Sequence, residues 1–220
     1  MTDFDNIKEI GFFKALFLTW KKSLFSPEVF YKELDYDDTA MVSDSEFGIL
    51  RPYFYALIFT YISLVFSLFW EVFFFKISLY SNYTILSKIP LFLSDKSSMV
   101  LYLIAGSIFL LLLFGILYTI FLAILTVIIH GFVMLMGGNK GIKNTFRIIG
   151  YASGVGVFSI LPIFGYNISA AWFAVLLIIG VKETNELSTQ KSIMTLLLPF
   201  ILILMIFITF LIKIILIRQP

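Results

Sequence analysis

The sequence predicts an all-α integral membrane protein, a polytopic helix bundle with five transmembrane helices and an N-terminal amphipathic helix. Three observations lead to this fold class. Of the 220 residues, 60% are hydrophobic and only 14% are charged, whereas a soluble domain is about a quarter charged. The apolar residues form long continuous runs without alternation, which favours helices over a β-barrel. Most charged residues lie before or between these runs.

The first 51 residues differ from the rest, because they carry 10 of the 14 acidic residues. We therefore divide the chain into an N-terminal segment, 1–51, and a membrane domain, 52–217. Within residues 7–25 an apolar stripe recurs at steps of three and four and leaves the lysines aside: Ile10, Phe13, Phe17, Trp20 and Leu24, against Lys14, Lys21 and Lys22. This pattern predicts an amphipathic helix, which either lies in the membrane interface or packs as a soluble helix on the membrane domain.

A second, shorter helix is predicted after this one. Ser26-Pro27-Glu28 is typical of a helix start, with a capping hydroxyl, a proline at the first position and an acid in the first turn. We expect the helix to run from Pro27 to about Leu34. The acidic stretch 35–46 then reads as an exposed linker.

Five apolar regions follow and are the predicted spans: 52–75, 99–136, 148–164, 166–181 and 195–212. The second contains no Asp, Glu, Lys or Arg. As a straight helix it would measure about 57 Å, nearly twice the hydrocarbon core of a bilayer. It is either one long helix or two spans with a tight turn. We expect one helix, because region 99–136 contains no Pro, Asn or Asp and is followed by the stop signal Gly137-Gly138-Asn139.

Lys and Arg set the predicted orientation, since cytoplasmic loops are enriched in both. With a cytoplasmic N-terminus, the segments 1–51, 137–147 and 182–191 contain 11 of the 16 basic residues. We therefore expect the N-terminus inside and the C-terminus outside. The expected location is the cytoplasmic membrane of a prokaryote, with the eukaryotic ER or Golgi membrane as the alternative.

The sequence offers few residues that could bind a metal ion or catalyse a reaction. The chain has no cysteine and a single histidine, His130, so neither a metal site nor a catalytic set is expected. We expect no cofactor and no enzymatic activity. The net charge of +2 gives no reason to expect nucleic-acid binding. His130 is interpreted as a neutral side chain hydrogen-bonded to a neighbouring helix, with a proton relay as the alternative.

Two further features have both a structural and a functional interpretation. Gly150 and Gly154 have the spacing that lets helix backbones approach closely, so we expect packing there and keep a substrate path as the alternative. Glu71 lies near the end of the first span and is expected to reach the interface, the alternative being a buried carboxylate.

The order of several short motifs resembles the Yip domain family of Ypt/Rab-interacting-protein-like membrane proteins, and especially its prokaryotic members. The resemblance covers about residues 12–215. It rests on Trp20…Leu24-Phe25-x-Pro27-x-x-Phe30, Phe47-Gly48…Pro52, His130…Gly137-Gly138…Thr145-Phe146-Arg147…Tyr151-Ala152-Ser153 and Pro162…Gly165…Trp172…Gly180…Leu187-Ser188…Lys191. Where the family often has a proline, this chain reads Gly154-Val155-Gly156.

The resemblance implies five spans and a cytoplasmic N-terminus. In eukaryotic relatives it also implies vesicle trafficking and contact with small GTPases. The candidate functional or packing residues are His130, Gly137, Gly138, Arg147, Gly150, Tyr151, Gly154, Pro162 and Trp172.

Two functions compete. The first is a membrane scaffold or adaptor of the Yip type that organises membranes or traffic through protein contacts. Its expected partners are the lipid bilayer, a protein at the N-terminal segment and further copies of the chain. The second is a small transporter, channel or lipid-handling protein. It would need polar residues facing one another within the membrane, and the sequence offers few: Thr126, Ser153, Ser159 and Ser169.

Overall fold

The computed structural model describes residues 3–40, 47–81 and 96–217, and every regular element in these ranges is helical. The all-α fold class is therefore confirmed. In chain order the elements are η1 (Asp3–Asn6), α1 (Ile7–Ile10), α2 (Phe12–Phe25), α3 (Pro27–Ala40), α4 (Phe47–Ser81), α5 (Lys96–Leu135), α6 (Ile142–Ala152), η3 (Ser153–Ile160), α7 (Gly165–Asn185) and α8 (Thr189–Ile217).

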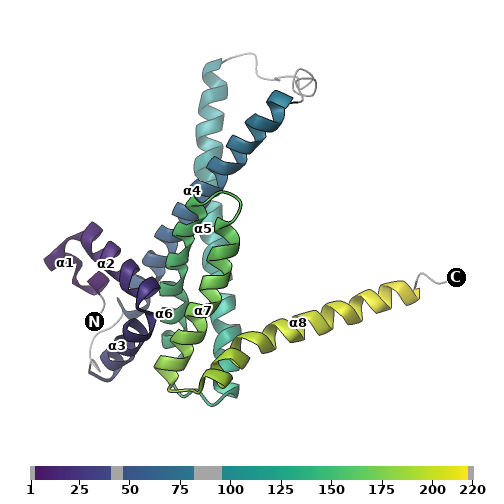
Figure 1. Cartoon of the computed structure of the whole chain (residues 1–220). Helices are drawn as coiled ribbons and strands as arrows, with labels where there is room; N and C mark the ends of the chain where they lie inside the picture. Colours follow the sequence, from purple (N-terminus) through teal and green to yellow (C-terminus); the bar gives the residue numbers. More distant parts are fainter. Residues whose placement is uncertain (1–2, 41–46, 82–95, 218–220) are drawn as a thin grey trace.

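The helices form a bundle with two attachments (Figure 1). α4, α5, α6 and α7 lie along one another, and the far ends of α4 and α5 extend beyond the others. α2 and α3 pack on one side of this bundle, where α3 lies beside α7. α8 packs on α5 and α7 only through its first turns, then runs away from the bundle to the C-terminus.

Within the described ranges, four helices are long and apolar enough to cross a membrane: Gly48–Glu71, Gly106–Leu135, Gly165–Asn185 and Thr189–Phe210. They correspond to four of the five predicted spans. The predicted span 148–164 is instead divided between α6 and the 3₁₀ helix η3. At ideal rises of 1.5 and 2.0 Å per residue these two elements extend about 32 Å end to end. A fifth crossing thus stays a prediction.

The long second region is one helix, as expected, and its end has a physical cause. α5 runs unbroken over 40 residues. Beyond it Gly137 adopts φ +95°, and its N–H donates to the Met134 carbonyl at 3.0 Å while that of Gly138 donates to Val133 at 2.9 Å. This pair of bonds is the Schellman arrangement, which satisfies the last carbonyls of a helix and needs a glycine at the left-handed position.

The N-terminal boundaries differ from those predicted. Gly11, at φ +83°, interrupts the predicted helix 7–25 and separates α1 from α2. α3 continues to Ala40, so the predicted linker 35–46 is wrong over its first half. The reason is that the sequence contains no glycine or proline from 29 to 46 to stop a helix. Residues 41–46 lie outside the described ranges.

α4 also begins earlier than expected, at Phe47, so the predicted domain boundary between residues 51 and 52 falls inside this helix. Pro52 lies in its second turn. Because proline has no N–H, the helix loses one hydrogen bond there.

The protein core lies where α2, α3, α4, α6 and α7 meet. Its largest fully buried side chains include Leu24, Tyr31, Tyr55, Ile148 and Tyr151. In contrast, the large apolar side chains of α5 and of α8 beyond Pro199 are mostly exposed. Such a surface is stable only in lipid, where packing and hydrogen bonds, rather than hydrophobic burial, hold helices together.

Candidate functional site

The 3₁₀ helix η3 is the centre around which the N-terminal helices and the membrane domain meet. Its eight residues make it unusually long, since runs beyond three or four are uncommon. Backbone groups at membrane depth need partners within the protein. Side chains of three other helices supply them: Trp20 Nε1 donates to Gly154 O at 3.1 Å, Trp70 Nε1 to Ile160 O at 3.2 Å and Ser169 Oγ to Val155 O at 3.0 Å.

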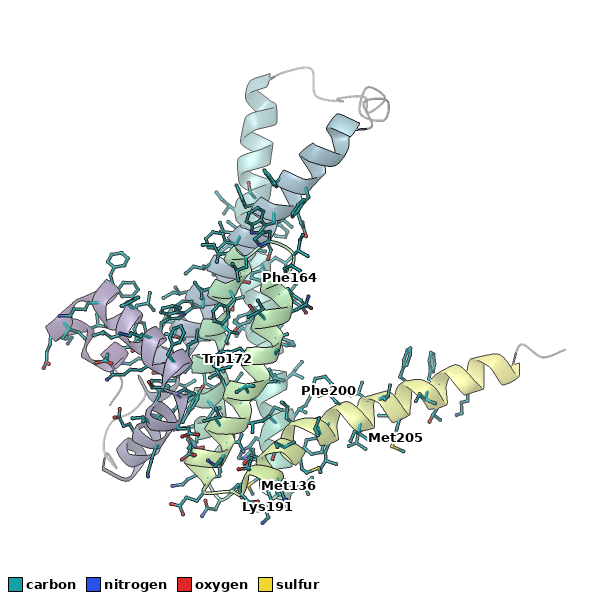
Figure 2. All side chains as sticks on the ribbon, viewed as in Figure 1. Met136, Phe164, Trp172, Lys191, Phe200 and Met205 are labelled. Carbon is teal, nitrogen blue, oxygen red and sulfur yellow. The ribbon has the colours of Figure 1, made fainter. Side chains whose placement is uncertain are left out.

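Two indole groups attach α2 to the bundle in opposite directions. Trp20 of α2 donates to the Gly154 carbonyl of η3. Trp172 of α7 donates to the Leu24 carbonyl near the end of α2, at 3.3 Å, and Figure 2 shows this indole at the junction between α7 and the N-terminal helices. Each indole thus satisfies a carbonyl of the other part, which fixes both the position and the direction of α2.

A cluster of three buried tyrosines continues the junction from α3 into α4 and α6. The Tyr31 hydroxyl donates to the Ile148 carbonyl at 3.3 Å. Tyr55 lies 3.2 Å from Ser23 through its hydroxyl oxygen, and its ring meets that of Tyr151 edge-on with centroids 5.2 Å apart. Burial raises the pKa of Tyr31, so this phenol stays neutral and keeps its proton for donation.

The predicted small-residue positions face other parts of the protein, backbone and side chain of Pro52 at Gly150 and side chains alone at Gly154. A Cβ on Gly150 would lie 2.9 Å from both Cβ and O of Pro52. On Gly154 it would meet the Tyr55 hydroxyl and, at 3.0 Å, Cδ1 of Leu24. Close approach of α4 and α2 to this segment thus requires glycine, and the geometry favours packing over a substrate path.

The face by which α2 packs overlaps the predicted apolar stripe only in part, through Trp20 and Leu24. The buried residues are Ala15, Thr19, Ser23 and Leu24, whereas Phe13 and Phe17 of the stripe are 83% and 56% exposed. Ala15, Thr19 and Ser23 recur every four residues. This is the small-residue spacing that we used for Gly150 and Gly154, so the same rule could have identified the packing face of α2.

The remaining predicted residues lie away from this junction. His130 of α5 is half-buried, and its Nδ1 lies 3.0 Å from Thr145 Oγ1 of α6, which fits the structural interpretation of a histidine bonded to a neighbouring helix. Gly137 and Gly138 form the turn after α5. Arg147 is half-buried on α6. Among the residues that the structure describes, no group of three His, Cys, Asp or Glu could hold a metal ion.

Pro162 belongs to a strained turn between η3 and α7. The Phe164 N–H donates to the Pro162 carbonyl at 2.6 Å, and the intervening Ile163 has φ +65°. Such a γ-turn is rare, and a β-branched residue with positive φ is an outlier. The turn lets the chain reverse within three residues between two packed elements.

Together the apolar helices, the buried hydrogen bonds and the exposed apolar surface define a polytopic α-helical integral membrane protein. The family model of the Yip1 domain matches residues 21–211. The chain belongs to the Yip1 domain family. No curated protein and no solved structure matches it.

Proposed function

We propose that this chain is a membrane-embedded adaptor, in which the membrane domain holds the N-terminal helices in position for contact with a protein partner. The observation that carries this proposal is the reciprocal pair of indole hydrogen bonds, Trp20 to Gly154 and Trp172 to Leu24. These two directional bonds and the buried tyrosine cluster fix the N-terminal helices on the membrane domain, so they do not form a freely moving tail. Because the N-terminal helices are already held in place, less conformational entropy is lost when a partner binds them.

The outward side of α3 supplies the contact surface. Phe30, Tyr31 and Leu34 are buried against the membrane domain, which leaves an exposed side made of Glu28, Val29, Lys32 and Glu33. The sequence remains acidic over 35–38. A partner with a basic surface would be attracted to this side, since complementary charge speeds encounter and selects partners.

A cytoplasmic N-terminus, membrane organisation or trafficking as the wider role, and self-association are further parts of the proposal. Self-association would use α8, whose side chains from Phe200 to Phe210 are exposed. In Figure 2 Phe200 and Met205 project from α8 with no second helix beside them. A cysteine replacing Ile206, which is 70% exposed, should form an oxidative cross-link between copies, whereas one replacing the buried Ser192 should not.

The adaptor role is tested by cross-linking the full-length tagged protein in its native membrane. The parent should retain one protein partner in stoichiometric amount. The double variant Glu28→Lys/Glu33→Lys should lose it. The control Glu186→Lys alters an exposed acid after α7 and should keep it. Recovery of a lipid or solute without any protein would contradict the proposal and favour the transporter alternative.

A further inference from the structure

A cavity of about 480 Å³ lies between α4, α5, η3 and α7, with Ile149 of α6 also in its wall, and no residue of α2 or α3 lines it. The residues that line it include five with hydroxyl groups: Thr60, Ser63 and Ser67 from α4, Tyr118 from α5 and Tyr166 from α7. The sequence predicts few polar residues facing one another within the membrane. The cavity shows that serines and threonines of α4, interspersed singly among apolar residues, converge on the same space.

The serines named from the sequence line this cavity as well, and their protons are already used. Ser153 donates to the Ile149 carbonyl at 3.0 Å, Ser159 to Gly156 at 2.6 Å and Ser169 to Val155 at 3.0 Å. A hydroxyl has two lone pairs besides its proton. Ser153 Oγ also lies 3.2 Å from the Tyr118 hydroxyl, so one of its acceptor positions is already used. Ser159 and Ser169 present acceptor oxygens, and a ligand that matches them must supply hydrogen-bond donors.

The charged residues that line the cavity restrict the chemical class of the ligand further. Glu71 is the one ionisable acid among the lining residues of the described chain, and the lining includes no Lys, Arg or His. A carboxylate accepts hydrogen bonds and repels anions. A phosphate or carboxylate head would find no cation in these walls, whereas a hydroxyl or ammonium head would find oxygen acceptors.

The walls combine hydroxyl-bearing and apolar side chains over a considerable length. On α4 the lining extends from Thr60 to Glu71, a rise of about 16 Å, which is close to one leaflet of a ~30 Å hydrocarbon core. Glu71 lies at one end, whereas Leu122, Leu125 and Phe173 provide apolar wall elsewhere in the cavity. A carboxylate at one end, with apolar wall beside the hydroxyl residues, suits an amphiphile whose head makes hydrogen bonds and whose tail is a hydrocarbon.

We propose that this cavity binds a membrane amphiphile whose head offers hydrogen-bond donors and has no net negative charge. The hydroxyls and the Glu71 carboxylate accept from the head, and the apolar wall contacts the tail. This site goes beyond the adaptor role and does not depend on it, because the α3 surface contributes nothing to its walls.

The test uses the full-length protein in nanodiscs with a photoreactive monoacylglycerol. Three competitors have hydrocarbon chains of the same length with one double bond: monooleoylglycerol with a hydroxyl head, oleylamine with an ammonium head, and oleic acid with a carboxylate head. Monooleoylglycerol, which has the head group of the probe, should reduce labelling by at least about tenfold at 100-fold excess, as mass action requires for a shared site. Competition by oleylamine as well would show that the site also accepts an ammonium head. Labelling that resists monooleoylglycerol, or competition by oleic acid equal to that of monooleoylglycerol, would overturn the proposal.

Variants that fill the cavity test whether the photoreactive lipid binds there. Ser67→Phe fills the cavity and should abolish labelling. Leu68→Phe, at an exposed neighbour that does not line it, should leave labelling unchanged. Ser63→Leu is a second filling variant, and the melting temperature of each protein shows that it is folded. A folded filling variant that labels as strongly as the parent would overturn the proposal. Loss of partner binding in the Glu28→Lys/Glu33→Lys variant would not affect this outcome.

Discussion

Individual residues at the junction between α2 and the bundle show how a non-α backbone becomes tolerable in lipid. The Gly154 carbonyl accepts from Trp20, and Gly154 itself leaves room for Tyr55 and Leu24. A single glycine therefore has two functions: its carbonyl accepts from the Trp20 indole, and the absence of a side chain makes room for Tyr55 and Leu24. Substitution there should disturb both.

We expect Gly154→Leu to destabilise the fold by roughly 1–3 kcal/mol, the usual cost of overpacking, because the new side chain would collide with Tyr55 and Leu24. The measurement is thermal unfolding of the purified protein in detergent. Gly131→Leu is the matched control on α5, since a Cβ at Gly131 meets nothing within 4 Å. An unchanged melting profile for Gly154→Leu would refute packing and favour a path along this helix.

An ion pair at the start of the chain makes a smaller, pH-dependent contribution. Lys22 Nζ lies 2.9 Å from Asp3 Oδ2, and this hydrogen bond raises the pKa of Lys22. The contribution is therefore complete below the ordinary lysine pKa of about 10.4 and is lost as pH rises through the raised value. Because the Lys22 side chain is 50% exposed, we expect only about 0.2–1 kcal/mol. Protection of residues 3–6 from proteolysis should be constant from pH 7 to 9 in the parent and weaker in Lys22→Met.

At the scale of elements, α2 combines the two interpretations that the sequence left open. It packs on the membrane domain through Ala15, Thr19 and Ser23, as a soluble helix would. It also leaves Phe13 and Phe17 exposed beside Lys14 and Lys21. An aromatic side flanked by lysines is the composition of an interfacial helix.

We therefore expect a peptide of residues 7–25 to gain helical circular dichroism with anionic vesicles, because apolar burial and lysine attraction act together. Phe13→Ser/Phe17→Ser should remove most of the gain. The matched control Thr19→Ala/Ser23→Ala changes the opposite face and should bind as the parent does. A parent peptide that stays disordered with vesicles would leave packing as the only role of this helix.

For the whole molecule, the main prediction to test is the membrane topology, with five spans and a cytoplasmic N-terminus. The chain has no native cysteine, so single cysteines can report on each side. Cysteines at Asn139 and Ser188, both exposed in the structure, should be protected from an impermeant reagent added outside. A cysteine at Ser87, outside the described residues, should react because the predicted loop 76–98 faces out. Labelling at Asn139 from outside would contradict five spans with a cytoplasmic N-terminus.

By itself the sequence determined the fold class, the family resemblance and the single long helix α5. These follow from local physics: uninterrupted apolar runs make helices in lipid, and Gly137-Gly138-Asn139 favours the left-handed cap that ends a helix. The continuation of α3 to Ala40 was within reach of the same reasoning, because the stretch lacks any stop signal.

The conformation of the third apolar region and the side chains that surround it depend on tertiary contacts. Residues 153–160 are apolar enough for an α-helix, yet they adopt 3₁₀ geometry, with carbonyls bonded by Trp20, Trp70 and Ser169. These donors lie up to 134 positions away in the chain, so no local pattern can reveal them. The cavity has the same origin. Its hydroxyls are scattered singly along helices of period 3.6, and they become a site only when the packing of four elements turns them toward one space.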